Sequence, residues 1–231
     1  RAARALPCFE VTEHNVAEVV ALCRHLDGNP LAIELAAARV RDLPVAEIAA
    51  RHQSHLELPS QGDGAPAARH GSLRAAIDCS HELLAIQERV LLRRLSVFRG
   101  GCHLAAAEAV CADGELAEAA VLDLLAGLVD KSLVVVRASC GRRRHELPES
   151  IRLYAAERLE QAGETERLRD AHLGYYLALA AEAEPHLRGG NETAWLDRLE
   201  LEHANLRAAL GWSVRSGDDA VRARRLAAAL L

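Results

Sequence analysis

The fold of this chain is decided at Leu26-Asp27-Gly28-Asn29-Pro30-Leu31-Ala32, where one helix ends and another begins. Apolar residues recur at helical spacing before this stretch, which predicts a helix over residues 12–26 with Thr12 as its cap. Pro30 suits the first turn of a following helix, expected over residues 31–40, because the N–H that proline lacks would be unpaired there.

Composition indicates a helical chain with an aliphatic core. Of its 231 residues, 50% are hydrophobic but only 3% are aromatic, and the strong helix formers Ala, Leu, Arg and Glu dominate. The net charge of −5 argues against a protein that coats nucleic acid. No apolar run of about 18 residues is present, so we expect no membrane span. The six cysteines form no Cys-x-x-Cys pair, which is typical of reduced, mostly buried thiols in the cytoplasm.

The remaining pattern predicts more helices and one hairpin. Pro and Gly with few apolar residues indicate a linker over 59–71. A short β-branched run, a Gly-containing turn and a basic run predict a β-hairpin over 132–147. Helices that precede such a hairpin form a winged-helix arrangement. The other helices are expected at 44–50, 72–84, 87–95, 104–111, 115–130, 149–162, 165–184, from 193 and from 219.

Gly28-Asn29-Pro30-Leu31-Ala32 resembles the Gly-Leu-Pro-Leu-Ala motif of STAND signalling NTPases, the NB-ARC-like group, with Asn29 in place of the family's leucine. The resemblance continues in the family's order through residues 73–78, 92–98, 122–134, 151–155, 194–200 and 202–210. Such segments occur in bacterial transcriptional regulators of the LuxR and SARP/AfsR types.

The resemblance implies a mainly α fold in three parts. A small helical domain over 1–58 would be followed by the linker at 59–71 and a winged helix with a β-hairpin over 72–162. Antiparallel, TPR-like helical repeats would begin at 163 and continue to 231. Since the chain begins with Arg1 and contains no methionine, we expect it to be part of a longer protein.

The same resemblance implies a nucleotide switch. Gly28, Pro30 and Leu31 would contact the adenine side of ADP or ATP, whose phosphates and Mg²⁺ would be held by an upstream P-loop domain. The single lysine, Lys131, follows no glycine-rich turn, so this chain carries no P-loop. Further partners would be a protein or small-molecule inducer at the repeats, DNA through a separate effector domain, and other copies on activation. From spacing alone the Gly28–Pro30 turn is an ordinary helical corner; the ordered resemblance favours the nucleotide contact.

Direct DNA binding by the winged helix is disfavoured. The predicted helix 115–130 carries four acids and no arginine, whereas phosphate and guanine contacts need Arg or Lys. The hairpin is basic. We expect its arginines either to lie in a solvated turn or to form ion pairs with other parts of this chain. These are Arg137, Arg142, Arg143 and Arg144. Pro148 stands where related proteins place a phosphate-sensing histidine, and Glu149 is expected at the start of the next helix.

Candidate catalytic and metal-binding residues are few. His52 with His55, and Cys102-His103 with Cys111, do not form complete ligand sets at zinc-site spacing. His203, on the apolar stripe of the last complete helix, is expected to be packed. We therefore predict no enzyme. The alternatives to the nucleotide switch are a protein-interaction scaffold with decayed nucleotide contacts, the sensor half of a cyclase-type protein, and a DNA-binding winged helix.

Overall fold

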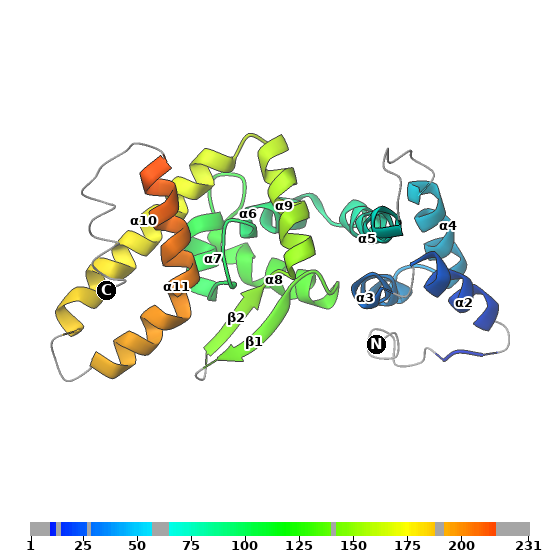
Figure 1. The fold of residues 1–231 in the computed structure, drawn as a ribbon, viewed down its shortest axis with the longest axis horizontal. Coiled ribbons are helices and arrows are strands. Elements are labelled where there is room, and N and C mark those ends of the chain that lie inside the picture. Colours follow the sequence, from blue (N-terminus) through cyan, green and yellow to red (C-terminus); the bar gives the residue numbers. More distant parts are fainter. Residues whose placement is uncertain are drawn as a thin grey trace. The chain divides into compact units, whose positions relative to one another are not determined.

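The computed structural model describes residues 10–12, 15–26, 29–56, 65–139, 142–187 and 192–215, and these are predominantly helical. The predicted hairpin is the two-stranded antiparallel sheet of β1 (Val135–Ser139) and β2 (Arg142–Glu146), in which Arg137 pairs with Arg144 (Figure 1). The expectation of a mainly α fold is confirmed. None of the described helices is long and apolar enough to span a bilayer.

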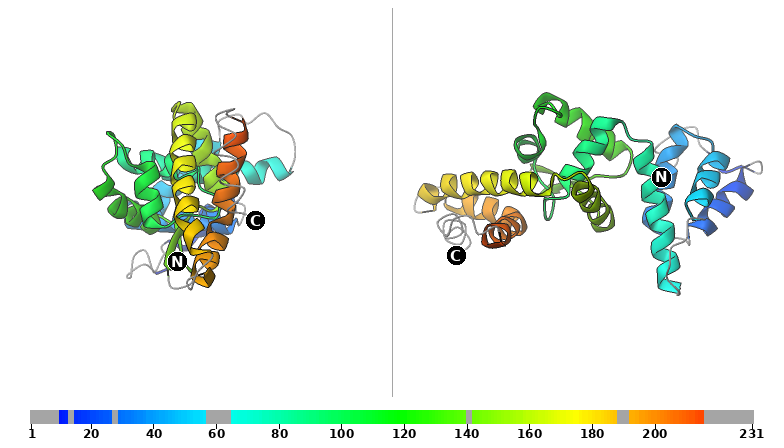
Figure 2. Two further views of the ribbon diagram at one scale, coloured as in Figure 1. Left: turned by 90° about the vertical axis from the view of Figure 1, so that its left-hand side faces the viewer. Right: turned by 90° about the horizontal axis from the view of Figure 1, so that it is seen from above.

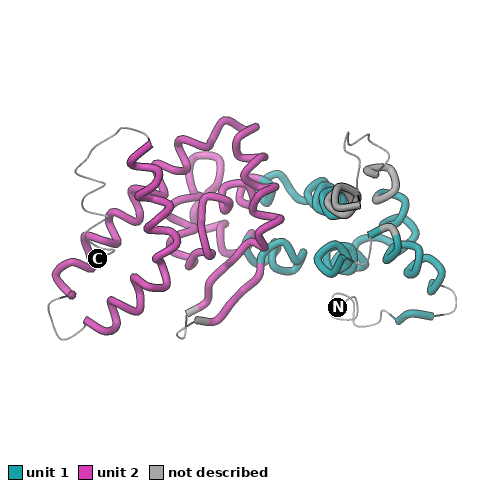
Figure 3. Tube along the Cα trace, in the orientation of Figure 1, with its two compact units in different colours: residues 1–89, 125–134 teal, residues 90–124, 135–231 magenta. Residues whose placement is uncertain are grey.

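The chain divides into two compact units (Figure 3). Unit 1 contains residues 1–89 and 125–134, and unit 2 contains residues 90–124 and 135–231. Two helices contribute residues to both units: α6 (Ile86–Leu95) and α8 (Val121–Asp130). The division therefore does not follow chain order.

Unit 1 is a packed set of short helices. Its complete α-helices are α2 (Val16–His25), α3 (Pro30–Ala38), α4 (Val45–Leu56) and α5 (Ala65–Glu82), with a 3-10 turn at Arg39–Arg41. Helix α4 packs on both α2 and α5, and α3 packs on α5. Leu26, Leu35 and Ile77 are fully or almost fully buried in its core. The buried guanidinium of Arg39 donates to the Ser80 carbonyl at 2.8 Å, which ties the end of α3 to α5.

Two helix starts differ from the prediction in this unit. Helix α5 begins at Ala65, so the stretch predicted as linker is helical from 65 to 71. Pro66 lies in the first turn, where proline is tolerated, and the surrounding alanines outweigh the cost of about 1 kcal/mol for a glycine inside a helix. Helix α2 begins at Val16 instead of near Thr12, whose backbone N–H donates to the Asn15 side chain at 2.9 Å.

Helix α5 packs against α3 and α4 and belongs to unit 1. The domain boundaries at 58, 71 and 162 remain predictions.

Helix α8 also starts later than predicted. Residues 113–116 form a turn because Asp113 Oδ1 accepts the backbone N–H groups of Glu115 at 2.8 Å and Leu116 at 3.1 Å. Ala117 is extended, a 3-10 turn covers Glu118–Ala120, and α8 runs from Val121. The expected helix 115–130 is thus wrong over its first six residues, because an aspartate side chain competes locally for backbone N–H groups.

Unit 2 contains α7 (Leu104–Cys111), the hairpin, α9 (Glu149–Gln161), α10 (Thr165–Ala183) and α11 (Glu192–Arg215), with a 3-10 turn at Glu184–His186. Gly163 ends α9 with a φ of +69°, as its position in the sequence predicts. Helices α10 and α11 pack side by side and run in opposite directions (Figures 1 and 2). This is the antiparallel helix pair expected for the start of the repeats.

The described cysteines are free thiols, namely Cys23, Cys79, Cys102 and Cys111. All but Cys23 are buried, which agrees with the predicted reduced and mostly buried state. Burial raises the pKa of Cys111 to about 12, so this thiol is protonated and unreactive at neutral pH. Cys8 and Cys140 lie outside the described residues.

Candidate functional site

The predicted nucleotide elbow is located at the start of α3. Asn29 caps this helix, and its Oδ1 accepts the N–H groups of Leu31 at 3.0 Å and Ala32 at 3.2 Å. Pro30 occupies the first helical position with an exposed ring, and Leu31 is half-buried. Gly28 lies outside the described residues. Asn29 therefore supplies a side-chain cap for α3, and the role of the elbow in nucleotide binding stays a prediction.

The elbow offers an apolar ring but few free donors. Because Asn29 satisfies two of the N–H groups of the first turn, this helix start is poorly suited to hold phosphate. The only lysine, Lys131, is ion-paired with Glu88 within unit 1. The exposed Pro30 ring can lie against the face of a nucleobase. The start of α3 is thus suited to contact the base of a nucleotide. The phosphates would need donors from outside this helix start.

The hairpin arginines have different environments. Arg137 is exposed and pairs across the strands with Glu146 at 2.5 Å, and Arg143 is exposed. Arg144 is only 5% exposed and bonds through both terminal nitrogens to Glu202 of α11. The ion-pair interpretation of the hairpin is therefore right for Arg144 and Arg137. The side chain of Arg142 lies outside the described residues.

A buried polar cluster surrounds the Arg144–Glu202 pair, and we call it the Arg144 cluster. Glu202 also accepts the hydroxyl of Tyr176 at 2.9 Å and the amide of Asn205 at 2.8 Å. The Gly101 carbonyl accepts Arg144 at 2.9 Å and Asn205 at 2.9 Å. Gly101 has a φ of +78°, and a Cβ there would lie 2.6 Å from the His145 carbonyl oxygen, so only glycine fits. The cluster ties β2, the loop after α6, α10 and α11 together within unit 2.

Electrostatics in the Arg144 cluster favour the charged pair. Burial alone would lower the pKa of Arg144, but its hydrogen bonds and attraction to Glu202 raise the pKa instead. Next to the cluster, burial lowers the pKa of His172 to about 4, so this imidazole is neutral at pH 7. His172 packs between Phe98 and Tyr176, with ring centroids 5.3 Å and 4.6 Å away. The charge of the cluster is thus confined to one compensated pair.

Comparison with known proteins decides what the hairpin and its helices form. Residues 84–160 match the family "Winged helix-turn-helix domain". This stretch contains α6, α7, α8, both strands and α9. The chain carries a winged helix-turn-helix domain. The winged helix expected from the order of the helices and hairpin is confirmed.

Relatives of the chain support a transcription-regulator family. The "Putative HTH-type transcriptional regulator Rv0890c" of Mycobacterium tuberculosis is 45% identical over 217 residues, which are 94% of this chain and 24% of that protein. The "Uncharacterized protein Rv0894" of M. tuberculosis is 39% identical over 192 residues, which are 83% of this chain and 48% of that protein. The chain thus spans less than half the length of either relative. No solved structure matches the chain.

Within the winged-helix domain, α8 is poorly suited to contact DNA. Its exposed residues are Leu122, Asp123, Ala126 and Asp130. The helix contains no arginine or lysine, and its only charged side chains are acidic. Such a surface repels a phosphate backbone and offers no donor to guanine.

A second buried arginine, Arg94, lies at the centre of another group of ion pairs in unit 2. Arg94 is 1% exposed and donates to Glu164 at 2.5 Å, Asp113 at 2.9 Å, Glu115 at 2.9 Å and the Cys111 carbonyl at 2.8 Å. Burial would raise the pKa of Asp113, but the bonds from Arg94 and the backbone lower it to about 2. These contacts fix α6, the loop after α7 and the start of α10. We call this group the Arg94 cluster.

Sequence reasoning missed the buried polar face of α11. The predicted stripe placed His203 inside the core, but His203 is exposed, and that expectation is wrong. The buried positions are Leu199, Glu202, Asn205, Leu206, Ala209 and Ser213. These recur at helical spacing too, which was the available signal. A carboxylate is stable in the core only when a charged or hydrogen-bonding partner lies beside it. The partner of Glu202, Arg144, lies 58 residues away in the sequence, so helical spacing alone does not show the pair.

The described residues contain no group of three or more His, Cys, Asp or Glu side chains arranged to hold a metal ion. His103, one member of the weak metal-ligand pattern, instead lies with Nε2 3.2 Å from Arg144 and Nδ1 3.0 Å from the Arg143 carbonyl. Cys102 is buried, and its backbone pairs with that of His145. These residues therefore form part of the hairpin's support.

Proposed function

We propose that this chain is the relay segment of a transcriptional regulator controlled by ADP and ATP, and that its winged-helix domain contacts protein instead of reading DNA. The Arg144 cluster carries this proposal. In this cluster the wing residue Arg144 is buried in an ion pair with Glu202 of α11, so the wing is bound to the helices that follow it. A wing held in this way is suited to transmit a change in those helices to the rest of the domain.

The nucleotide part of the proposal concerns α3. Pro30 and Leu31 would contact the base of ADP or ATP, with Gly28 in the turn before them. An upstream P-loop domain would hold the phosphates and Mg²⁺. The bound nucleotide selects between two arrangements of the protein, and it can do so only to the extent that it binds one more tightly. Inducer binding at the helical repeats would favour exchange, and a separate effector domain would bind DNA. We propose cytoplasmic location, assembly of several copies on activation, and no catalytic role for this chain.

Direct DNA binding is the second candidate, because the match to a winged helix-turn-helix family favours it. The acidic α8 argues against it, and so does the burial of Arg144. Arg143 remains as an exposed wing cation that could contact a phosphate.

A third candidate is a protein-interaction scaffold that has lost nucleotide contacts, and the sensor half of a cyclase-type protein is a variant of the same role. Pro148 favours this candidate, since it stands where related proteins sense phosphate and here serves as the N-cap of α9.

Substitution of Pro30 by alanine tests the nucleotide contact. In the native full-length protein we expect Pro30→Ala to weaken ADP binding by about tenfold, the loss expected for an apolar ring that no longer covers the base. Isothermal titration calorimetry with ADP and with ATP measures this. Pro44→Ala is the matched control, because Pro44 is an exposed proline at the start of another helix of unit 1, immediately before α4. Absence of ADP binding by the wild type would contradict the switch and favour the scaffold.

A further inference from the structure

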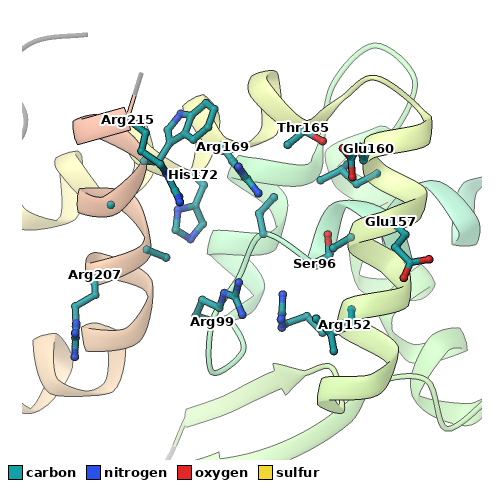
Figure 4. Close-up of a pocket in the computed structure, with 17 residues that line it drawn as sticks. Ser96, Arg99, Arg152, Glu157, Glu160, Thr165, Arg169, His172, Arg207 and Arg215 are labelled. Atoms are coloured by element: carbon teal, nitrogen blue, oxygen red, sulfur yellow. The ribbon is translucent and has the colours of Figure 1, made fainter. Parts of the chain in front are cut away.

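Unit 2 contains a groove that neither the winged-helix match nor the proposed switch uses. It is bounded by α9, α10, α11 and the loop that contains Ser96 and Arg99, and its volume is about 650 Å³ (Figure 4). Pockets of roughly 300–1,000 Å³ are typical of sites for small molecules. Every residue that lines the groove belongs to unit 2.

The groove is rich in cationic side chains. Five arginines and two glutamates line it, namely Arg99, Arg152, Arg169, Arg207, Arg215, Glu157 and Glu160. In Figure 4 the guanidinium groups of Arg99 and Arg152 point toward one another, while Glu157 points away from them. His172, which also lines the groove, is neutral at pH 7 and so adds no charge.

The arginines at one end of the groove are incompletely compensated. Glu149 bonds to Arg152 at 2.6 and 2.7 Å, but it lies 4.0 Å from Arg99. Arg169 lies over the Trp212 ring at 5.0 Å, and no carboxylate among the described residues lies within ion-pair distance of it. Burial, and then the like charges of Arg152 and Arg169, lower the pKa of Arg99. An anion placed between these groups would relieve their repulsion.

Other groups that line the groove are different in character. The hydroxyl of Thr165 is buried and has no hydrogen-bond partner among the described residues, and Figure 4 shows it near Glu160. The indole of Trp212 supplies an apolar wall. A ligand that fills the groove would therefore carry negative charge that faces the arginines, together with hydrogen-bonding and apolar groups.

We infer that this groove binds a phosphorylated small molecule, with the phosphate held by Arg99, Arg152 and Arg169. Guanidinium groups bind phosphate oxygens through paired, charge-assisted hydrogen bonds, which are stronger than neutral ones. Three helices and a loop bound the groove, and its volume of about 650 Å³ lies in the range of small-molecule sites. The ligand would contact α9 of the winged-helix domain together with both repeat helices. This site goes beyond the proposed switch, whose elbow lies in unit 1.

Inorganic pyrophosphate is the probe for this site. Trp212 provides the signal in a Trp195→Phe background, because the chain has only two tryptophans. Titration of the full chain is expected to change Trp212 fluorescence saturably with one site per chain. Arg99→Gln and Arg169→Gln should each weaken binding by about tenfold. Both side chains are suitable for substitution, since Arg99 keeps its backbone bond to Asn205 and Arg169 is exposed.

Arg143→Gln is the matched control, because it removes the same charge from an exposed position on the wing outside the groove. Unchanged urea midpoints of the three variants establish that they are folded. Pyrophosphate binding that Arg143→Gln leaves intact and the groove variants weaken supports the site. No saturable binding, or equal loss in all three variants, overturns it. Duplex DNA binding that requires Arg99 and Arg169 without pyrophosphate binding also overturns it, in favour of a nucleic acid surface.

Discussion

Replacement of Arg144 by methionine is expected to lower the free energy of unfolding by about 3–5 kcal/mol, the cost of leaving a buried charge without its partner. Glu202 is 4% exposed, and it would retain the hydrogen bonds from Tyr176 and Asn205 but lose its charged guanidinium partner. The carbonyl of Gly101 would also lose a donor. Urea unfolding followed by tryptophan fluorescence measures the loss, because Trp195 and Trp212 both lie on α11 and so report on unit 2.

Arg137→Met is the control for this result. Arg137 lies on the same hairpin and pairs with Glu146, but its side chain is 69% exposed, so we expect a loss below about 1 kcal/mol. Addition of Glu202→Gln to Arg144→Met should restore much of the stability, since the neutral amide still accepts from Tyr176 and leaves no buried charge. Equal, small losses for Arg144→Met and Arg137→Met would show that the Arg144 cluster does not bind the wing to α11.

Arg94→Met should have an effect of similar size, about 3–5 kcal/mol, for the same reason. Its guanidinium is 1% exposed and bonds to three carboxylates and one carbonyl. Without it, Glu164 would keep its bonds to Arg93 and Arg167, and Asp113 would keep its pair with Arg167 and the backbone N–H groups of residues 115 and 116. The measurement is again the urea midpoint followed by tryptophan fluorescence.

Arg167→Met tests whether burial of the arginine, and not its charge alone, accounts for the stability that the Arg94 cluster contributes. Arg167 pairs with the same two acids, Asp113 at 3.0 Å and Glu164 at 2.8 Å, but it is 45% exposed. We expect its loss to cost less than about 1 kcal/mol. A cost for Arg167→Met as large as that for Arg94→Met would contradict the structural role given to the buried arginine.

Local signals predicted much of the fold. Proline at the start of α3, glycine after α9 and the β-branched run of the hairpin each impose a backbone preference that depends on few neighbours. Helix α7 was predicted at the residues where it is found, Leu104–Cys111. The start of α8 was missed because Asp113 bonds to nearby backbone N–H groups, and a charge pattern does not show that competition.

The candidate site was less accessible to sequence reasoning. The elbow at Pro30 is a local motif, and its position at the start of α3 followed from the sequence. The Arg144 cluster joins Gly101, Arg144, Tyr176 and Glu202, which are far apart along the chain. A single sequence with no pairing information shows these as unrelated polar residues. The arginine-rich groove was missed for the same reason, because its side chains come from three helices and a loop.

Binding of this chain to duplex DNA is the measurement that tests most directly whether the winged-helix domain contacts protein, as proposed, or recognises DNA. Fluorescence anisotropy with a labelled duplex, at salt concentrations between about 50 mM and 200 mM, reports affinity and its salt dependence. We predict no saturable binding of the duplex, and no effect of Arg143→Gln on the anisotropy, because α8 is acidic and Arg144 is buried. Saturable binding that falls steeply with salt and is weakened by Arg143→Gln would contradict the account and assign the wing to DNA.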